Sequence, residues 1–252
     1  MKHSNSIEFK VYGKYALFTD PLTKTGGEKF TYRVPTYQAL KGICESVYWK
    51  PTIQWIIDDV RIMKPIRMQS QGMIPMYYRS AEENRLAIYT YLKDVEYEVR
   101  AHFVWNENRK DLREDRNKNK HWAIAKRMIE RGGKRDVFLG TRECQAYVEP
   151  CKFGEAKGYY DDIDMSFGNM VHGITYPDES EVVDGKGEMS VRFWDANMHK
   201  GIIHFITPGE CTIVKRIRNY KIKAFEKGLN FSDLKEFEKG GVFDNDVDKQ
   251  SD

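Results

Sequence analysis

The sequence has no apolar run long enough to span a membrane, and its first residues carry no apolar segment of the kind found in secretory signals. Disordered chains contain few aromatic residues, whereas 13% of the 252 residues here are Phe, Trp or Tyr. The composition therefore excludes a wholly disordered chain. Hydrophobic residues make up 40% of the chain and charged residues 31%. We therefore expect a globular protein of the cytoplasm that has no membrane partner.

Cysteine is scarce, and its spacing matches neither a zinc motif nor a disulfide framework. None of the four cysteines forms a Cys-x-x-Cys pair or lies within four residues of a histidine. The positions are Cys44, Cys144, Cys151 and Cys211. The histidines at 102, 172, 199 and 204 show no metal-ligand spacing either. The sequence thus predicts buried thiols, no metal ion and no cofactor.

The chain has almost no excess of positive or negative charge, because its 41 Lys and Arg residues nearly balance its 38 Asp and Glu residues and leave a formal net charge of +3. Local segments differ sharply from this average. Residues 109–135 hold eleven Lys or Arg against four Asp or Glu, whereas residues 155–190 hold nine acids against two bases. Residues 226–252 are also acidic, with eight acids against four bases. A basic segment within a near-neutral chain indicates a local anionic partner.

Strand-like and helix-like segments alternate up to residue 150. Hydrophobic periodicity and turn residues predict strands over 7–18, 53–64, 85–105 and 136–148, and helices over 37–48 and 118–131. Segment 85–105 reads as two strands or as one long strand with a bulge, and 136–148 as one strand with a bulge at Gly140. The order β-α-β-β-α-β predicts a ferredoxin-like α+β fold, in which both helices cover one face of an antiparallel sheet.

The remaining sequence predicts further small units. Residues 65–82 contain Pro65, Gly72 and Pro75, which indicate an irregular or hairpin excursion. Short strand patterns recur over 188–194, 201–206 and 211–218. We expect a ferredoxin-like domain over 1–155, a small antiparallel β domain over 156–225, and a flexible acidic tail over 226–252.

Three residues become candidates for catalysis once this order is applied. Tyr48 ends the first predicted helix, and Lys120 and His121 begin the second. In the predicted fold, the first helix ends at the edge of the sheet where the second begins, so the three side chains can face one site. Each also has an ordinary structural explanation: a packing tyrosine, a semi-buried histidine and a solvated lysine.

The chemistry of these groups suits the cleavage of RNA, in which a ribose 2′-hydroxyl attacks the neighbouring phosphate. Histidine can move the proton, lysine can stabilise the charge on phosphorus, and tyrosine can orient or donate. No metal is needed. A metal-dependent DNA nuclease is a weaker alternative, because Asp161, Asp162 and Asp164 form an acidic cluster that is either a solvated loop or a cation site.

The basic loop and second helix form a candidate RNA surface. Basic side chains can follow a phosphate backbone, and an indole ring can stack on a base. The candidate residues are Arg116, Lys118, Trp122, Lys126, Arg127, Arg131, Lys134 and Arg135. The alternative is a solvated, partly mobile segment, since nearby acids neutralise part of its charge.

Three long blocks of the chain resemble a known family. They are YRVPTYQALKGICESVYWKPTIQWIIDDVRIMKPI, KNKHWAIAKRMIERGGKRDVFLGTRECQAYVEP and GEMSVRFWDANMHKGIIHFI. Their content and order are similar to the CRISPR-associated Cas5 family, in its subtype d (Dvulg) form of type I-C systems. The similarity runs over roughly residues 5–220.

The resemblance implies a function as well as a ferredoxin-like N-terminal domain. Subtype d members cut CRISPR precursor RNA at the base of the repeat hairpin, using a tyrosine and an adjacent lysine-histidine pair. These match Tyr48, Lys120 and His121 here. The enzyme then stays on the 5′ end of the mature guide RNA, among the backbone and large subunits of the Cascade complex. Most other Cas5 proteins are non-catalytic scaffolds, and that role remains the alternative.

Overall fold

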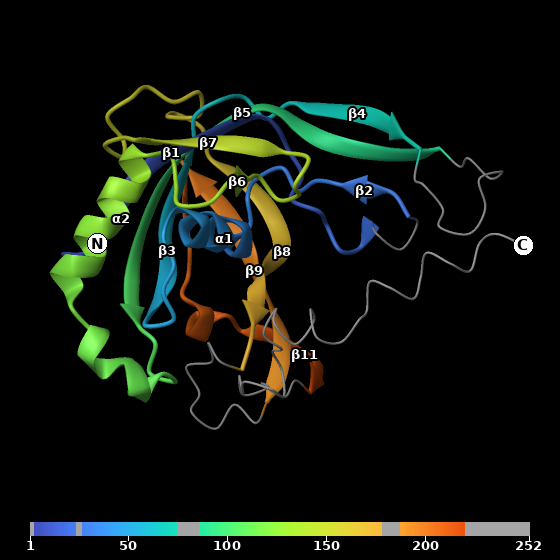
Figure 1. The fold of residues 1–252 in the computed structure, drawn as a ribbon. Helices are drawn as coiled ribbons and strands as arrows, with labels where there is room; N and C mark the ends of the chain where they lie inside the picture. The colour runs from blue at the N-terminus through green and yellow to red at the C-terminus, as the bar shows by residue number, and fades with distance from the viewer. Residues whose placement is uncertain (1–2, 24–26, 75–85, 178–186, 220–252) are drawn as a thin grey trace, which may run out of the picture.

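The computed structural model describes residues 3–23, 27–74, 86–177 and 187–219. In this part of the chain, eleven strands form one extensive sheet accompanied by two α-helices. All strand pairs are antiparallel except β2 (Lys29–Phe30) with β5 (Ala87–Trp105). The fold is therefore mostly β, and its helices are few (Figure 1). The predicted tail and residues 75–82 of the predicted excursion lie outside the described residues.

Four strands of the N-terminal half support the two helices. They are β1 (Ile7–Ala16), β3 (Ile53–Ile62), β5 and β7 (Gln145–Pro150), and they lie in the order β3-β5-β1-β7. The helices α1 (Tyr37–Val47) and α2 (Lys118–Glu130) follow β1 and β5 in the chain, apart from short intervening elements. A small strand, β6 (Val137–Phe138), closes the edge beside β7.

Strands from the C-terminal part continue the same sheet. These are β8 (Met165–Thr175), β9 (Glu188–His199), β10 (Ile202–His204) and β11 (Ile213–Asn219). Strand β10 pairs with both β3 and β9, so it joins these strands to the N-terminal half. The domain boundaries expected near residues 155 and 225 stay a prediction.

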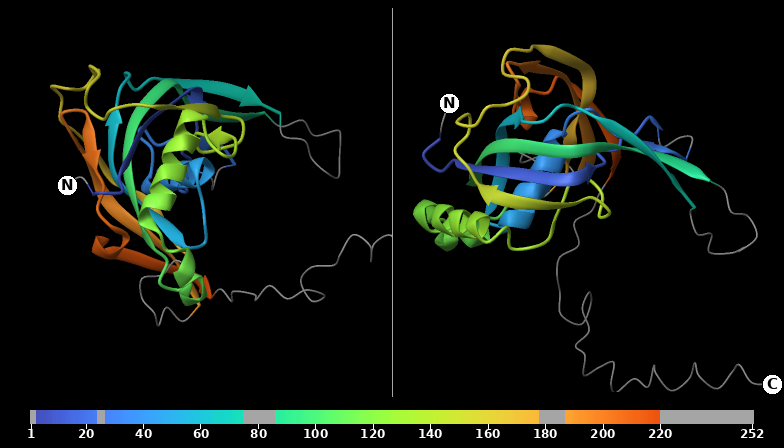
Figure 2. Two further views of the ribbon diagram at one scale, coloured as in Figure 1. Left: turned by 60° about the vertical axis from the view of Figure 1, so that its left-hand side comes forward. Right: turned by 90° about the horizontal axis from the view of Figure 1, so that it is seen from above.

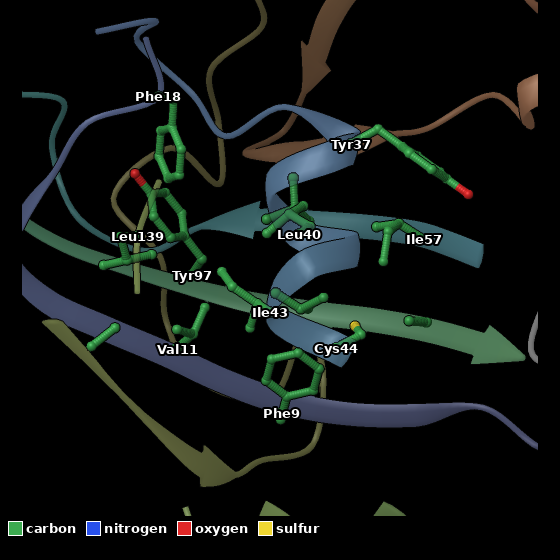
Figure 3. Close-up of a cluster of buried hydrophobic side chains, with 14 of the residues drawn as sticks. Phe9, Val11, Phe18, Tyr37, Leu40, Ile43, Cys44, Ile57, Tyr97 and Leu139 are labelled. Carbon is green, nitrogen blue, oxygen red and sulfur yellow. The ribbon is translucent and has the colours of Figure 1, made fainter. Parts of the chain in front are cut away.

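The sequence pattern explains why the core lies between α1 and the sheet. In β1, the inward residues Ile7, Phe9 and Val11 are buried, while the alternate positions are less so. Helix α1 begins where the Thr36 hydroxyl accepts a hydrogen bond from the Ala39 amide. Its apolar stripe then faces the strands, with Leu40 and other buried side chains visible in Figure 3.

Two segments differ from the prediction, and a third agrees with one of its two alternatives. Residues Ala87–Trp105 form one long strand, β5, as the second alternative expects, and Asp94 within it has a positive φ of 52°. The single strand expected over 136–148 is wrong: β6 and β7 are separate, and Gly140 between them has φ 95°. A Cβ at Gly140 would lie 2.0 Å from the Leu17 carbonyl oxygen, so the chain must turn here. Strand β8 was not predicted, and burial does not alternate regularly along it.

Smaller elements complete the description. Strand β4 (Met68–Met73) pairs with β5, and together they project from the rest of the sheet (Figure 2). Two short 3-10 helices lie wholly within the described residues, η2 (Lys110–Asp115) before α2 and η3 (Pro208–Glu210) before β11. None of the described helices is long and apolar enough to cross a membrane.

Candidate active site

Helix α2 begins directly beside the candidate residues. The Asn117 side chain accepts a hydrogen bond from the Lys120 amide and so caps the helix. The residues at i, i+4 and i+8 are buried against the sheet: His121, Ala125 and Ile129. Lys120 precedes the first of them and remains exposed. Residues four apart lie on one face of a helix, so His121 points toward the sheet together with Ala125 and Ile129, whereas Lys120 points toward solvent.

Tyr48 and His121 meet although they lie far apart in the sequence. The Tyr48 hydroxyl is 2.8 Å from His121 Nδ1. Tyr48 follows α1 in an extended conformation, and the Trp55 indole donates a hydrogen bond to its carbonyl oxygen at 2.7 Å. Tyr48 is 2% exposed and His121 is fully buried. The two groups thus form a closed pair beneath the protein surface.

The second nitrogen of His121 determines which tautomer is present. His121 Nε2 lies 2.8 Å from the backbone carbonyl oxygen of Asp115. A carbonyl oxygen can only accept, so Nε2 carries a hydrogen. In the neutral ring, Nδ1 is then an acceptor, and the Tyr48 hydroxyl donates to it. Phe103 and Trp105 of β5 contact the imidazole edge to face.

Asp115 connects the exposed lysine with the buried pair. Its carboxylate accepts a hydrogen bond from Lys120 Nζ at 2.6 Å and another from the Thr52 hydroxyl at 2.8 Å. One of its oxygens lies 3.4 Å from His121 Nε2. The hydrogen bond from Lys120, then that from Thr52, holds the pKa of Asp115 below its usual value. Asp115 therefore carries a negative charge at the start of α2, where the helix dipole also favours an anion.

Burial has the opposite effect on Tyr48. Removal from water, and secondly the charge of Asp115, raise the pKa of Tyr48 to about 12. The hydroxyl consequently keeps its proton at neutral pH. It can serve as a donor, and it does not act as a phenolate.

The structure thus brings Tyr48, Lys120 and His121 to one place, as the sequence predicts; their catalytic roles stay a prediction. The sequence singles out neither Asp115, which is one of the acids that neutralise part of the basic segment, nor Thr52. Asp115 could have been found from its place just before the cap of a helix, where the helix dipole favours an acidic residue. Nothing in the local sequence indicates Thr52.

The candidate RNA-binding residues fall into two groups. Three of them anchor α2: Lys118 contacts the Ser4 hydroxyl, the Trp122 indole donates to the Ser6 carbonyl oxygen at 3.0 Å, and Arg116 pairs with Glu107 at 2.9 Å. The others are exposed on or beyond the helix. They are Lys126, whose Nζ lies 4.2 Å from the centre of the Trp122 ring, and Arg127, Arg131, Lys134 and Arg135.

The acidic cluster is engaged in contacts within the protein. Asp161 pairs with Arg61 at 2.7 Å and accepts from the Gly158 amide. Asp164 accepts from the Lys200 amide and pairs with His199 at 2.8 Å. Among the described residues, these carboxylates do not gather around a common point with other metal-ligand groups. Asp161 and Asp164 thus both have ion-pair partners within the protein.

The mostly antiparallel β fold thus brings a hydroxyl, an imidazole and an ammonium group together at the N-terminus of α2. Residues 6–206 match the family model described as CRISPR-associated protein Cas5, in its Cas5d form. This chain belongs to the Cas5d family.

Two curated relatives are named CRISPR pre-crRNA endoribonuclease Cas5d. The protein of Mannheimia succiniciproducens is 27% identical over 218 residues, which cover 72% of this chain and 95% of the relative. The protein of Thermus thermophilus is 29% identical over 154 residues, which cover 57% of this chain and 63% of the relative.

Solved structures share the fold. A crystal structure of a CRISPR-associated protein is 37% identical with a TM-score of 0.69, and covers 83% of this chain and 96% of its own. A functionally uncharacterized protein from Streptococcus mutans is 36% identical with a TM-score of 0.66, over the same shares of the two chains.

Proposed function

We propose that this chain is a cytoplasmic, metal-independent endoribonuclease that cuts CRISPR precursor RNA within the repeat, at the base of its hairpin. One observation carries the proposal: the Tyr48 hydroxyl and His121 imidazole are 2.8 Å apart, next to Lys120, in a member of the Cas5d family. The names of the two curated relatives support the same substrate and reaction.

In the proposed reaction, Tyr48 and His121 carry out both proton transfers. The 2′-hydroxyl attacks the adjacent phosphorus while His121 Nδ1 takes the hydroxyl proton. Lys120 stabilises the charge on the nonbridging oxygens. The Tyr48 hydroxyl gives its proton to the leaving 5′-oxygen, and transfer from His121 back to Tyr48 restores both residues. The products are a 2′,3′-cyclic phosphate and a 5′-hydroxyl.

Asp115 occupies the place that a phosphate would take. Its carboxylate binds Lys120 Nζ at the N-terminus of α2, where main-chain amides and the helix dipole favour an anion. We infer that an RNA phosphate replaces Asp115 on Lys120, and that η2 moves with Asp115 to admit the 2′-hydroxyl to His121. This movement reconciles the buried pair with an RNA substrate.

The proposal has two further parts, one about the fold and one about the complex. We interpret the order β3-β5-β1-β7, with its two helices, as the ferredoxin-like core of an RNA-processing protein. After cleavage, the protein stays on the 5′ end of the guide RNA, and joins the backbone and large subunits of a type I-C Cascade complex.

A second candidate function is a non-catalytic, guide-binding scaffold of the same complex. The observation that favours it is the complete burial of His121, together with the 2% exposure of Tyr48. In this alternative the pair only stabilises the packing of α2 on β5.

The decisive experiment uses repeat RNA and purified protein in EDTA. We expect a single cut that leaves 2′,3′-cyclic phosphate and 5′-hydroxyl ends. A substrate with 2′-hydrogen at the cut nucleotide should bind equally well and remain intact. Cleavage of this deoxy substrate would refute the mechanism, and binding without any cleavage would favour the scaffold.

A further inference from the structure

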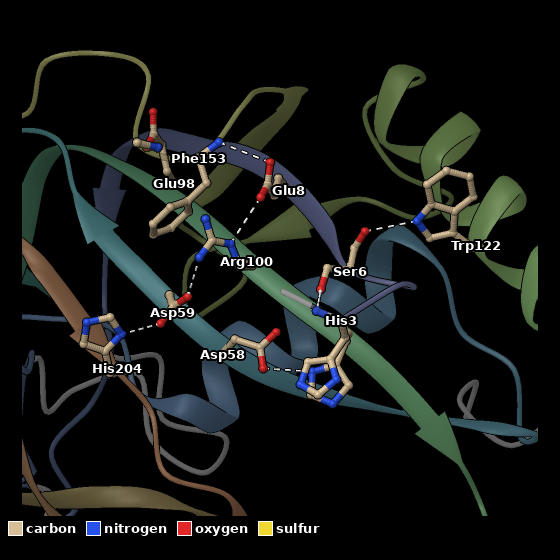
Figure 4. Close-up of polar contacts among 12 residues, drawn as sticks. His3, Ser6, Glu8, Asp58, Asp59, Glu98, Arg100, Trp122, Phe153 and His204 are labelled. Carbon is tan, nitrogen blue, oxygen red and sulfur yellow. Dashed lines mark hydrogen bonds and ion pairs between the residues drawn. The ribbon is translucent and has the colours of Figure 1, made fainter. Parts of the chain in front are cut away.

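A second cluster of side chains lies on the opposite face of β5 from His121. Side chains alternate along a strand, so His102 points away from its neighbour Phe103, which contacts His121. His102 Nδ1 lies 2.8 Å from Asp58 Oδ1, and the His3 ring stacks on the His102 ring with centroids 3.7 Å apart. Figure 4 shows His3 beside Asp58 on this face of the sheet.

An irregularity in β3 brings Asp58 to this place. The pairing of β3 with β5 shifts between Ile57 and Asp59, so Asp58 is the extra residue of a β-bulge. A bulge re-aims one side chain, and here Asp58 and Asp59 both reach the same face of the sheet. Asp59 contacts Arg100 and His204, whereas Asp58 contacts His102.

The Asp58 carboxylate has more bonding capacity than the described residues use. Its Oδ2 atom is buried and has no hydrogen-bond partner in the part of the chain that the structure describes. The Asp58 side chain is only 16% exposed, and its one ion-pair partner among those residues is His102. A buried carboxylate oxygen in this state costs free energy unless a cation or donor reaches it.

The N-terminal segment is held so that His3 completes the cluster. A turn closes between His3 and Ser6 through two hydrogen bonds of 3.0 Å. The Asn5 side chain donates to the Phe103 carbonyl oxygen, and the Ser6 carbonyl oxygen accepts from Trp122 of α2. The exposed His3 ring is thus attached to β5 on one side and to α2 on the other.

We propose that His3, Asp58 and His102 form a binding site for a zinc ion. Their potential ligand atoms all lie within 4.8 Å of one another. Tetrahedral zinc with bonds of about 2.0–2.1 Å needs separations of roughly 3.3 Å. Two changes reach this geometry. The exposed His3 side chain rotates, and two metal bonds replace the hydrogen bond between Asp58 and His102.

The donor set determines the choice of ion. Two imidazoles and one carboxylate suit zinc, and Ca²⁺ or Mg²⁺ would require mostly oxygen ligands. His3 and His102 also line a shallow pocket with Lys118, and water from this pocket supplies the fourth ligand. The ion would fasten the N-terminal turn to β3 and β5. It would act apart from RNA cleavage, because it lies across the sheet from His121.

The test is metal binding by full-length protein without an affinity tag, after removal of metals with EDTA. We expect one Zn²⁺ per chain, a rise in melting temperature with added Zn²⁺, and a Co²⁺ absorption spectrum typical of tetrahedral coordination. His3→Ala and Asp58→Asn should each weaken Zn²⁺ binding by about tenfold or more. His3 is exposed, so its replacement should leave folding unaffected.

His204→Ala is the matched control. His204 also pairs with an aspartate on this face, Asp59, at 2.5 Å, but among the described residues no third ligand joins that pair. This variant should bind Zn²⁺ like the native protein. No Zn²⁺ uptake by the native chain would overturn the proposal. Equal binding by native protein, His3→Ala and Asp58→Asn would overturn it as well.

Discussion

At the scale of single residues, the site depends on the directions of three hydrogen bonds. The Asp115 carbonyl oxygen keeps the hydrogen of His121 on Nε2, which leaves Nδ1 to accept from Tyr48. The Asp115 carboxylate in turn holds Lys120. Each proposed role can therefore be tested by removing one functional group.

Loss of any of the three proposed catalytic groups should slow cleavage more than it weakens binding. We expect His121→Ala, Lys120→Ala and Tyr48→Phe each to reduce the single-turnover rate on the order of 10²-fold or more. The reason is that each group moves a proton or stabilises charge in the reaction. Single-turnover kinetics at saturating protein, together with RNA titrations, measure the two effects separately.

Lys126→Ala serves as the comparison for these variants. Lys126 is exposed on the same helix, beside Trp122. Its loss should weaken RNA binding without slowing cleavage at saturation. If the three site variants instead lose affinity in proportion to rate, they act by positioning RNA, and the scaffold function gains support.

Removing the charge of Asp115 should strengthen RNA binding. Asp115→Asn frees Lys120 from its carboxylate partner and removes an anion from the N-terminus of α2. We expect affinity to rise roughly two- to fivefold, the range of an exposed ion pair. Fluorescence titration at low salt measures the change.

Asp111→Asn is the control for Asp115→Asn, because it also removes one negative charge from η2. Asp111 is exposed and pairs with Arg109 at 2.7 Å, away from Lys120. This variant should bind RNA nearly as the native protein does. Equal gains for both variants would show that only the overall charge matters, against the inferred displacement of Asp115 by phosphate.

At the scale of elements, the two ends of α2 carry different groups of residues. Its N-terminus carries Lys120 and His121, and beyond its C-terminus the backbone amides of Lys134 and Arg135 donate to the carbonyl oxygens of Val47 and Ser46. The end of α1 is thereby attached to the segment after α2. This attachment leaves the side chains of Arg131 and Arg135 exposed.

The exposed arginines should contribute to RNA affinity and leave the chemistry unchanged. We expect Arg131→Glu combined with Arg135→Glu to weaken binding and to flatten its salt dependence by about one unit per lost phosphate contact. Cleavage at saturating protein should be nearly unchanged, since Arg131 lies about three helical turns from Lys120. Binding titrations over several salt concentrations measure the slope.

A matched reversal of charge elsewhere is Lys152→Glu with Lys157→Glu. Both lysines are exposed in the loop after β7. This control should keep the native salt slope. An unchanged slope in the arginine variant would exclude this end of α2 from the RNA path.

At the scale of the whole molecule, buried aromatic side chains join the C-terminal strands to α1. His172 of β8 stacks on Tyr37 of α1 with ring centroids 4.3 Å apart, and it also contacts Trp194 and Phe205. Its Nε2 lies 2.9 Å from the Ile206 carbonyl oxygen and donates to it. Burial, and secondly the charge of Arg192, lower the pKa of His172 to about 4.

This lowered pKa predicts a loss of stability in mild acid. Between the unfolded pKa of about 6.5 and the folded value, the unfolded chain binds a proton that the folded chain does not. The contribution to the free energy of unfolding is complete above about pH 6.5 and declines as the pH falls toward 4. Urea unfolding at about pH 7.5 and about pH 5 measures it, with an expected difference on the order of 1 kcal/mol.

His172→Gln should remove this part of the pH dependence, because glutamine does not titrate. His199→Gln is the control, since the His199 side chain is 66% exposed. The control should retain the native pH dependence. If His172→Gln loses as much stability in acid as the native chain, His172 is not the responsible group.

The sequence by itself determined the two helices and most strands, because hydrophobic periodicity and turn chemistry are local. The order of these elements and the family resemblance then indicated Tyr48, Lys120 and His121 as candidates that share one edge of the fold. Only the tertiary structure decided that they bond directly and are buried, since burial depends on how η2 and β5 pack around them.

The contacts among His3, Asp58 and His102 were beyond prediction for the same reason. Asp58 reaches His102 through a bulge whose position depends on strand register, and His3 joins them because the N-terminal turn binds β5 and α2. No spacing in the sequence encodes such a meeting. Local patterns thus determined which elements form, and long-range pairing decided which side chains meet.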